Sequence, residues 1–176
     1  VLADFGAEIF TVELVSISFM REVGVLLTAI MIAGRSGSAF TAEIGMMRAR
    51  EEIDAIRALG MDPMELLVVP RVLALLIMLP VLAFLATLAG ILGGALVGSM
   101  SLSISPGLFL ARMQETAELR HLLVGMVKAP VFAVVIALVG CLEGLKVRAS
   151  AESVGRHTTS SVVQSIFLVI LVDAIA

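Results

Sequence analysis

Long apolar runs separated by short polar segments dominate the pattern of this chain. The clearest run, residues 72–97, contains no charged residue, although Pro80 lies within it. At 1.5 Å per residue, a helix of that length covers about 39 Å, which exceeds the ~30 Å hydrocarbon core of a bilayer. Further long helical segments are predicted at residues 11–40, 122–142 and 158–176.

The polar segment between the first two long helices has a helical pattern of its own. Residues 42–59 contain no proline, and apolar or small residues recur there at steps of three and four, namely Met46, Ala49, Ile53, Ile56 and Gly60. The charged residues between them predict two i,i+4 ion pairs, Arg48 with Glu52 and Arg50 with Asp54. Gly60 followed by Asp62-Pro63 is a helix stop signal. We therefore predict one short amphipathic helix here.

Composition supports a membrane protein. Hydrophobic residues make up 60% of the 176 residues, charged residues only 15%, and the mean hydropathy is +1.11. Soluble domains carry about 25% charged residues. The net charge of −3 gives no basic patch for nucleic acid, and the single cysteine, Cys141, excludes an internal disulfide. We predict an all-α polytopic membrane protein in which residues 1–176 form a single transmembrane domain.

Basic residues predict the orientation of the polar segments. Two segments are rich in them: residues 43–71 hold Arg48, Arg50, Arg57 and Arg71, and residues 143–157 hold Lys146, Arg148 and Arg156. The intervening segment, residues 99–120, holds only Arg112 and Arg120. The first two are therefore expected to be cytoplasmic and the third external. The external segment is expected to form a turn at residues 99–107 and a short amphipathic helix at residues 108–120.

Two interpretations of the charged cytoplasmic helix remain open at this point. It could lie on the lipid headgroups as a solvated surface helix, or it could dock on a soluble partner. Helices that bind anionic lipid are rich in lysine and arginine, whereas this one mixes acidic and basic residues. The mixture favours docking. Arg71, the last charge of the segment, is predicted to belong to the foot of the next span.

Three stretches of this sequence resemble the MlaE (YrbE) family of permeases of ATP-binding cassette transporters. They are Gly34-Arg35-Ser36-Gly37-Ser38-Ala39-Phe40-Thr41-Ala42-Glu43-Ile44-Gly45-Met46-Met47, Leu59-Gly60-Met61-Asp62-Pro63, and Gly155-Arg156-His157-Thr158-Thr159-Ser160-Ser161. The resemblance covers nearly the whole chain. Against the family pattern, we expect the N-terminal interfacial helix, most of the first span and the end of the last span to be absent.

The resemblance implies a lipid-transport subunit with several partners. It implies a homodimer in the bacterial inner membrane, an ATPase subunit, an MCE-domain protein on the external side and, in some systems, a STAS-domain protein. Phospholipid is the implied substrate. No cofactor is expected on this chain, because it has no G-x-x-x-x-G-K-[ST] phosphate loop, so ATP and Mg²⁺ belong to the partner ATPase.

The resemblance also implies which residues act in coupling and in lipid binding. The family's coupling helix rests on the ATPase, and it matches Glu43, Met46, Met47, Arg48, Arg50, Glu51, Glu52, Ile53, Asp54, Ile56, Arg57 and Asp62. The span that borders the family's lipid cavity matches Arg21 and Glu22, with Phe5 as a further candidate for acyl-chain contact. A pair of charges at mid-bilayer costs several kcal/mol unless it is paired or hydrated. We therefore leave a structural ion pair open as the alternative role of Arg21 and Glu22.

Other function classes have weaker support. An ion-coupled secondary transporter would use the charges within the spans as ion sites. Gly34-Arg35-Ser36-Gly37 also matches the G-x-S-G serine motif of rhomboid-type proteases, but neither His121 nor His157 is predicted to serve as the base. The long side chain of Lys128 is expected to reach the external interface, and no role is assigned to Asp173.

Overall fold

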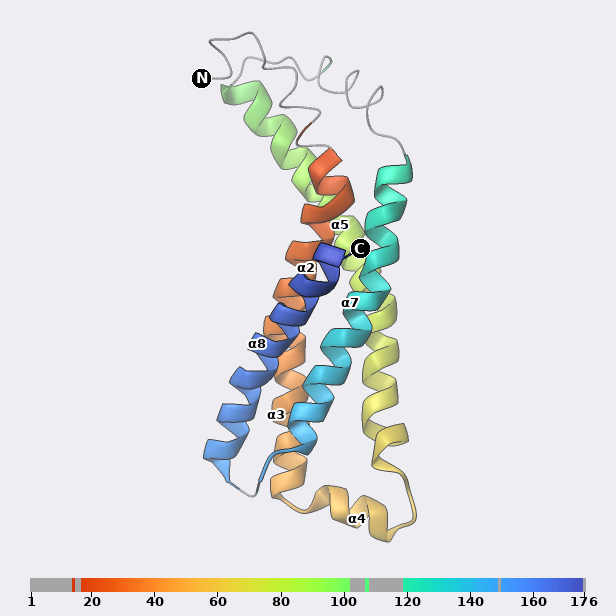
Figure 1. Ribbon diagram of the computed structural model, residues 1–176, viewed down its shortest axis with the longest axis vertical. Coiled ribbons are helices and arrows are strands. Elements are labelled where there is room, and N and C mark those ends of the chain that lie inside the picture. The colour runs from red at the N-terminus through yellow and green to blue at the C-terminus, as the bar shows by residue number, and fades with distance from the viewer. Residues whose placement is uncertain (1–13, 15–16, 102–106, 108–118, 149, 176) are drawn as a thin grey trace.

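The computed structural model describes residues 14, 17–101, 107, 119–148 and 150–175. Helices account for nearly all of these residues, and the described part contains no strand (Figure 1). In chain order the elements are η2 (Phe19–Val23), α2 (Gly24–Ile32), η3 (Ala33–Gly37), α3 (Ser38–Ala49), α4 (Glu52–Ala58), η4 (Met64–Val68), α5 (Val69–Ser101), α7 (Leu119–Leu145) and α8 (Ala151–Ile175).

Four continuous helical segments are long and apolar enough to cross a membrane. They are Phe19–Ala49, Met64–Val97, Arg120–Leu145 and Ala151–Ile175. The elements from η2 to α3 together form the first of them, and single π-helical turns interrupt its α-helical geometry at η2 and η3. The prediction of an all-α polytopic membrane protein is confirmed. The external helix was predicted over residues 108–120. Residues 108–118 lie outside the described residues, and Leu119 and Arg120 begin α7.

The predicted helix over residues 42–59 is wrong, because the structure divides it into two. α3 continues the first span to Ala49, and the chain then turns at Arg50 and Glu51, where Glu51 adopts a left-handed φ of 62°. α4 starts in a new direction and lies crosswise at one end of the bundle (Figure 1). The predicted stop holds, since Gly60 has a φ of 78° that favours glycine.

Packing explains why α3 belongs to the span. Ile44 is fully buried, and a Cβ built on Gly144 of α7 would lie 2.8 Å from the Ile44 Cβ. A Cβ on Gly45 would lie 2.8 Å from a methyl group of Val147, just beyond α7. These close contacts hold residues 38–49 against α7. The apolar and small residues that recur at helical spacing therefore have different neighbours before and after the turn at Glu51.

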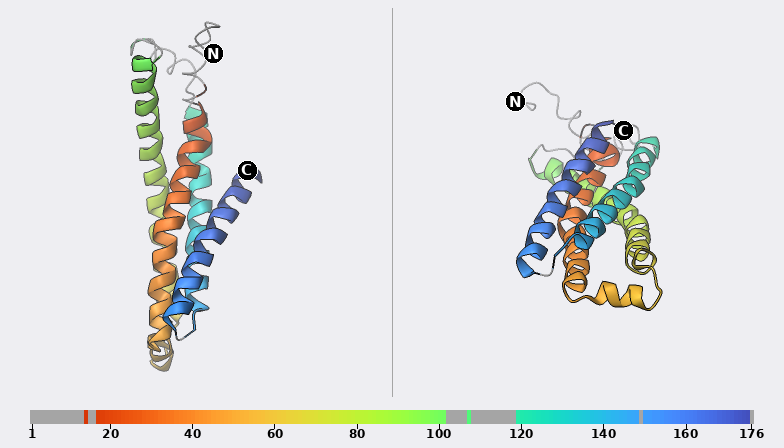
Figure 2. Two further views of the ribbon diagram at one scale, coloured as in Figure 1. Left: turned by 90° about the vertical axis from the view of Figure 1, so that its left-hand side faces the viewer. Right: turned by 60° about the horizontal axis from the view of Figure 1, so that its bottom comes forward.

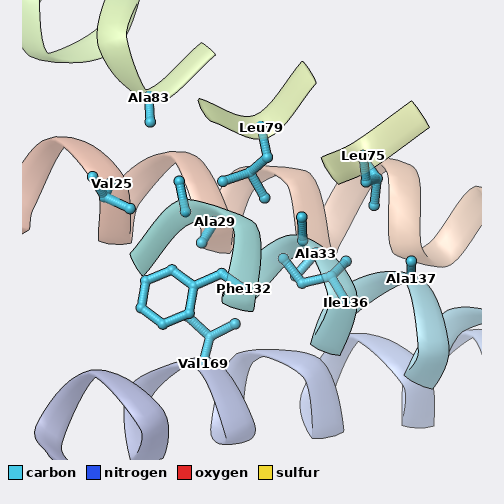
Figure 3. Close-up of a cluster of buried hydrophobic side chains, with 12 residues drawn as sticks. Val25, Ala29, Ala33, Leu75, Leu79, Ala83, Phe132, Ile136, Ala137 and Val169 are labelled. Carbon is cyan, nitrogen blue, oxygen red and sulfur yellow. The ribbon is translucent and has the colours of Figure 1, made fainter. Parts of the chain in front are cut away.

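Small residues form the centre of the bundle. Along the first span they recur every four residues at Ala29, Ala33, Gly37 and Thr41, and along α7 at Gly125, Ala129, Ala133 and Ala137. All five alanines are fully buried, and Figure 3 labels Ala29, Ala33 and Ala137 among them. Such ridges let helix backbones approach closely within a membrane, where packing and interhelical hydrogen bonds drive association.

The closest approach joins the first span to α7 at two glycines. A Cβ built on Gly140 would lie 2.9 Å from the carbonyl oxygen of Gly37, and the Thr41 hydroxyl donates to the Gly140 carbonyl at 2.9 Å. Around this contact, larger side chains of α5, α7 and α8 complete the core, including Leu79, Phe132 and Val169 (Figure 3). α7 thus packs against the first span, α5 and α8.

Two glycines of α5 differ in their surroundings. Gly90 lies against the Phe19 ring, where a Cβ would clash, whereas nothing lies within 4 Å of a Cβ at Gly93. α8 begins at Ala151, earlier than the predicted residue 158. Ser150 accounts for the early start, since its hydroxyl accepts the backbone N–H of Ser153 at 3.1 Å, as an N-cap does.

α4 and the connection between α7 and α8 lie at the same end of the bundle (Figures 1 and 2). We call this the α4 end. The two segments that the charge pattern assigned to one side of the membrane do lie together, as predicted. Arg71 lies in the first turn of α5, as also predicted.

Candidate functional site

α4 is held to the bundle by one buried side chain. Ile53 is fully buried in a cluster with Ile44, Leu67, Val68 and Cys141, while Ile56 packs against its edge. Ile53 was predicted as a residue that contacts a partner. Because its side chain is enclosed within this chain, it anchors α4 instead.

The outward surface of α4 and of the loop after it carries both charged and apolar residues. Glu51, Glu52, Asp54 and Arg57 are exposed, as docking requires. Leu59 and Met61 are exposed as well, with 74% and 43% of their surfaces accessible. Sequence reasoning did not select these two, although two apolar residues beside the Gly60 stop are a signal that it could have used. We call these six residues the α4 face.

Ion pairs on the α4 face do not follow the predicted i,i+4 pattern. Asp54 lies 3.3 Å from an Arg48 nitrogen and 3.2 Å from an Arg57 nitrogen, while Arg50 lies 3.8 Å from Glu52. The predicted partners assumed a continuous helix, and the turn at Glu51 changes the register. The acids of these pairs are 45–57% exposed, so each pair contributes about 0–1 kcal/mol.

Another ion pair lies at the base of the segment that carries α4. Arg71 donates to the Glu43 carboxylate at 2.9 Å and to the Leu67 carbonyl at 2.7 Å. Its guanidinium also lies 5.7 Å from the centre of the Phe40 ring. The Arg71 side chain is 19% exposed, whereas the Glu43 side chain is 61% exposed. Glu43, another predicted docking residue, is therefore engaged within the chain, while Met46 is 48% exposed and Met47 packs against the Ile53 cluster.

A second buried cluster at the α4 end joins α7 to α8. The Glu143 side chain is 5% exposed and accepts from Lys146 Nζ at 2.7 Å. Its other oxygen lies 2.8 Å from His157 Nδ1. Glu143 is thus paired from its own helix and from α8. Asp62 is separate from this cluster, and its carboxylate accepts the Met64 backbone N–H at 2.9 Å.

Arg21 and Glu22 lie near the opposite end of the bundle. They occupy η2 (Phe19–Val23), near the beginning of the described part of the first span. Arg21 Nε is 3.6 Å from Glu22 Oε1, and both side chains are about half exposed. Neighbouring Gly125 of α7 packs against the backbone of Met20 and Arg21. Phe5 lies outside the described residues.

Lys128 and Asp173 form the most enclosed ion pair among the described residues. Lys128 Nζ is 3.1 Å from Asp173 Oδ1, and the two side chains are 9% and 16% exposed. Lys128, which was expected to reach the external interface, thus pairs with a charged residue of another span. Its partner is 45 residues away in sequence, on α8, and sequence reasoning had assigned Asp173 no role.

Two largely apolar cavities lie beside the spans. One of about 460 Å³ is lined by Arg120, Leu123, Val124, Val127 and Lys128 of α7. The other, of about 390 Å³, lies between the first span and α5 and is lined by Thr28, Met31, Ile32, Arg35, Leu82 and Ala86. Both volumes fall in the range of roughly 300–1,000 Å³ that is typical of small-molecule sites. Within the described residues, no group of three His, Cys, Asp or Glu side chains has the placement of a metal site.

A family model described as "Permease MlaE" matches residues 1–176. The chain belongs to the MlaE permease family. The resemblance that the three sequence stretches indicated is confirmed over the full length given.

Curated relatives of this MlaE-family chain carry names that agree with that assignment. A probable ABC transporter permease protein of Synechocystis is 41% identical over 167 residues, which is 95% of this chain and 64% of the relative. The Haemophilus influenzae "Intermembrane phospholipid transport system permease protein MlaE" is 37% identical over 176 residues, or 99% of this chain and 67% of that protein. The chloroplastic protein TRIGALACTOSYLDIACYLGLYCEROL 1 of Arabidopsis thaliana is 34% identical over 158 residues, or 90% of this chain and 45% of the relative. The chain thus spans about 64% of the length of several relatives.

The described residues of this MlaE-family chain do not have the catalytic geometry that the protease alternative requires. Among the described residues, no hydrogen bond joins Ser36 to either histidine. His157 does have an orienting carboxylate, Glu143, which the sequence could not supply. A base with an orienting group but no nucleophile in contact is not a catalytic triad. Close packing explains Gly37 of the motif, whereas nothing lies within 4 Å of a Cβ at Gly34.

Proposed function

We propose that this chain is the membrane-spanning permease part of an ATP-binding cassette transporter for phospholipid or a related hydrophobic substrate. The observation that carries the proposal is α4 itself: a short helix set across one end of four membrane-length helices, anchored by Ile53, with a charged and apolar outer face. Family membership and the relatives' names support the same role.

The α4 face would dock on a separate ATPase subunit on the cytoplasmic side. Its mixed charges suit a protein groove better than anionic lipid, and Leu59 supplies an exposed apolar contact. Interfaces of this kind combine a few apolar anchors with a polar rim. ATP and Mg²⁺ would bind the ATPase, and this chain would perform no hydrolysis. Motion of the ATPase would then reach the spans through α4.

At the opposite end, charges are placed to meet a lipid headgroup. Arg21 and Glu22 are half exposed there, and the cavity lined by Arg120 and Lys128 has apolar walls that suit acyl chains. We propose that lipid passes this end on its way between the bacterial inner membrane and an external MCE-domain partner. A homodimer and, in some systems, a STAS-domain protein that binds the ATPase complete the proposed assembly.

Charge reversal on the α4 face tests the proposal. Glu51→Lys, Glu52→Lys and Asp54→Lys, combined in one variant, should release the ATPase in a pull-down of the full-length complex from membranes. Glu152→Lys is the matched control, because Glu152 is an exposed acid at the same end but lies on α8. An ATPase that copurifies with the triple variant as with the wild-type protein would contradict docking through these residues.

An ion-coupled secondary transporter is the second candidate, and the enclosed pair of Lys128 and Asp173 is the observation that favours it. In that case the two side chains would be part of an ion site near the middle of the transport path. Lipid transport by reconstituted complex distinguishes the candidates. The proposed function requires transport that depends on ATP and is blocked by vanadate, whereas the alternative requires an ion gradient and no ATP.

A further inference from the structure

Two residues close the base of the segment that carries α4. Glu43 lies on α3, before the chain turns toward α4, and Arg71 lies in the first turn of α5, after the chain has returned. They are 28 residues apart in sequence, yet Arg71 Nη2 is 2.9 Å from Glu43 Oε2. Between them the chain completes α3, turns into α4 and returns through η4 to α5, a path that can be followed in Figure 2.

Arg71 uses its planar guanidinium in three ways at once. One nitrogen donates to Glu43, another donates to the Leu67 carbonyl at 2.7 Å, and the ring of Phe40 lies 5.7 Å from the guanidinium carbon. Phe40 and Glu43 belong to α3, whereas Leu67 belongs to η4. A guanidinium can hold all three groups in a fixed relation, which a lysine ammonium cannot. Arg71 therefore ties the end of the first span to the start of the next.

Few other contacts hold α4 to the bundle. Ile53 is its only fully buried side chain, and it packs on Ile44 of α3 and on Leu67 and Val68 of η4. These are the same two elements that Arg71 ties together. A push on α4 through Ile53 would thus act on α3 and η4 jointly, and the Glu43–Arg71 ion pair links α3 to the start of α5 beside this cluster.

We propose that Glu43 and Arg71 form a coupling joint, which makes α3 and α5 move together with α4 when a partner acts on α4. The inference rests on the proposed function, and it assigns Arg71 as a positioning residue. It also gives Glu43 a role within this chain. The joint converts displacement of α4 into displacement of two spans, without touching substrate or nucleotide.

Charge reversal with rescue tests the joint in the reconstituted full-length complex with its ATPase. Arg71→Glu and Glu43→Arg each place like charges at the joint, and the double variant restores an opposite pair. We measure ATPase copurification, ATP hydrolysis, thermal unfolding and lipid moved per ATP hydrolysed. Each single variant should keep the ATPase and its hydrolysis but move about tenfold less lipid per ATP, within the roughly 5–150-fold range typical of coupling between sites. The double variant should recover most of the loss.

Two further variants separate coupling from stability. Arg71→Lys keeps the charge but cannot hold Glu43 and the Leu67 carbonyl in one planar fork, so lipid moved per ATP should fall to an intermediate value. Arg148→Glu is the matched control, because Arg148 is exposed at the same end and has no ion pair among the described residues. It should transport as the wild-type protein does.

The outcomes distinguish this inference from the proposed function. A wild-type complex that binds no ATPase overturns the proposed function, and the joint with it. If the wild-type complex couples ATP to transport, single variants with normal lipid movement per ATP overturn the joint alone. A double variant as defective as the singles also overturns it. So does a loss of transport that only follows a loss of thermal stability or of ATPase association, since a purely structural role would give that result.

Discussion

Removal of one charge from the enclosed pair of Lys128 and Asp173 should destabilise the bundle far more than removal of both. In Lys128→Met, the Asp173 carboxylate remains 16% exposed without its partner at 3.1 Å. Truncation of one partner of a buried ion pair costs about 3–5 kcal/mol, because the remaining charge stays desolvated. Replacement of both partners by apolar residues of similar volume is often neutral or stabilising by roughly 1–4 kcal/mol. The double variant Lys128→Met with Asp173→Leu should therefore be at least as stable as the wild-type protein.

The size of the coupling energy between Lys128 and Asp173 distinguishes a desolvated ion pair from an ordinary polar contact between membrane helices. Interhelical hydrogen bonds in membranes contribute about 0.6 kcal/mol on average and at most ~1.7 kcal/mol in double-mutant cycles. We expect a coupling energy above that limit for Lys128 and Asp173. The exposed pair of Arg50 and Glu52, at 3.8 Å, is the control and should give under ~1 kcal/mol.

The assay is the free energy of unfolding in mixed micelles for the wild-type protein, both single variants and the double variant. Near-additive single effects, with a coupling energy below ~1 kcal/mol, would refute the reasoning. That result would mean that water reaches both side chains and that neither is desolvated. Helix content measured at the start of each titration confirms that each variant is folded before the comparison is made.

Three further outcomes follow from the packing. Gly140→Val should cost about 1–3 kcal/mol of unfolding free energy, because its side chain would meet the Gly37 carbonyl, whereas Gly155→Ala, with nothing within 4 Å, should not destabilise. Ile53→Ala should cost about 2–5 kcal/mol locally and should increase proteolysis at α4 without unfolding the spans; unchanged proteolysis would show that Ile53 is no anchor. Ser36→Ala should retain full lipid transport, and loss of activity with an intact fold would revive the protease alternative.

The spans could be predicted from the sequence because their signal is local. An uncharged run from residue 72 to 97 is long enough to cross a bilayer whatever it packs against, and α5 covers it. The ladder of small residues was also available in the sequence, at Ala29, Ala33, Gly37 and Thr41, but was not used. Its four-residue period is visible without any structure, and it marks the face that packs against α7.

The turn that starts α4 could not be predicted from local pattern. Residues 42–59 keep a helical period through it, and neither glycine nor proline marks the change of direction. The chain turns at Glu51 with a φ of 62°, which few residues other than glycine adopt. Tertiary packing determines this, since Ile44 must remain against α7 while Ile53 reaches the cluster beside Leu67. A single helix cannot satisfy both contacts.

Ion pairs show the same limit most clearly, because the sequence gives the position of each charged residue but not which residue it will pair with in the fold. Arg71 was correctly placed at the foot of a span, and Glu43 was assigned to a docking surface through the family resemblance. Their separation of 28 residues carries no periodic signal, so only the fold brings them to 2.9 Å. Once they meet, the Glu43 carboxylate compensates the charge of Arg71, which is 19% exposed, while Glu43 itself remains 61% exposed. Only the fold could therefore show that Glu43 lies at the base of the segment that presents α4.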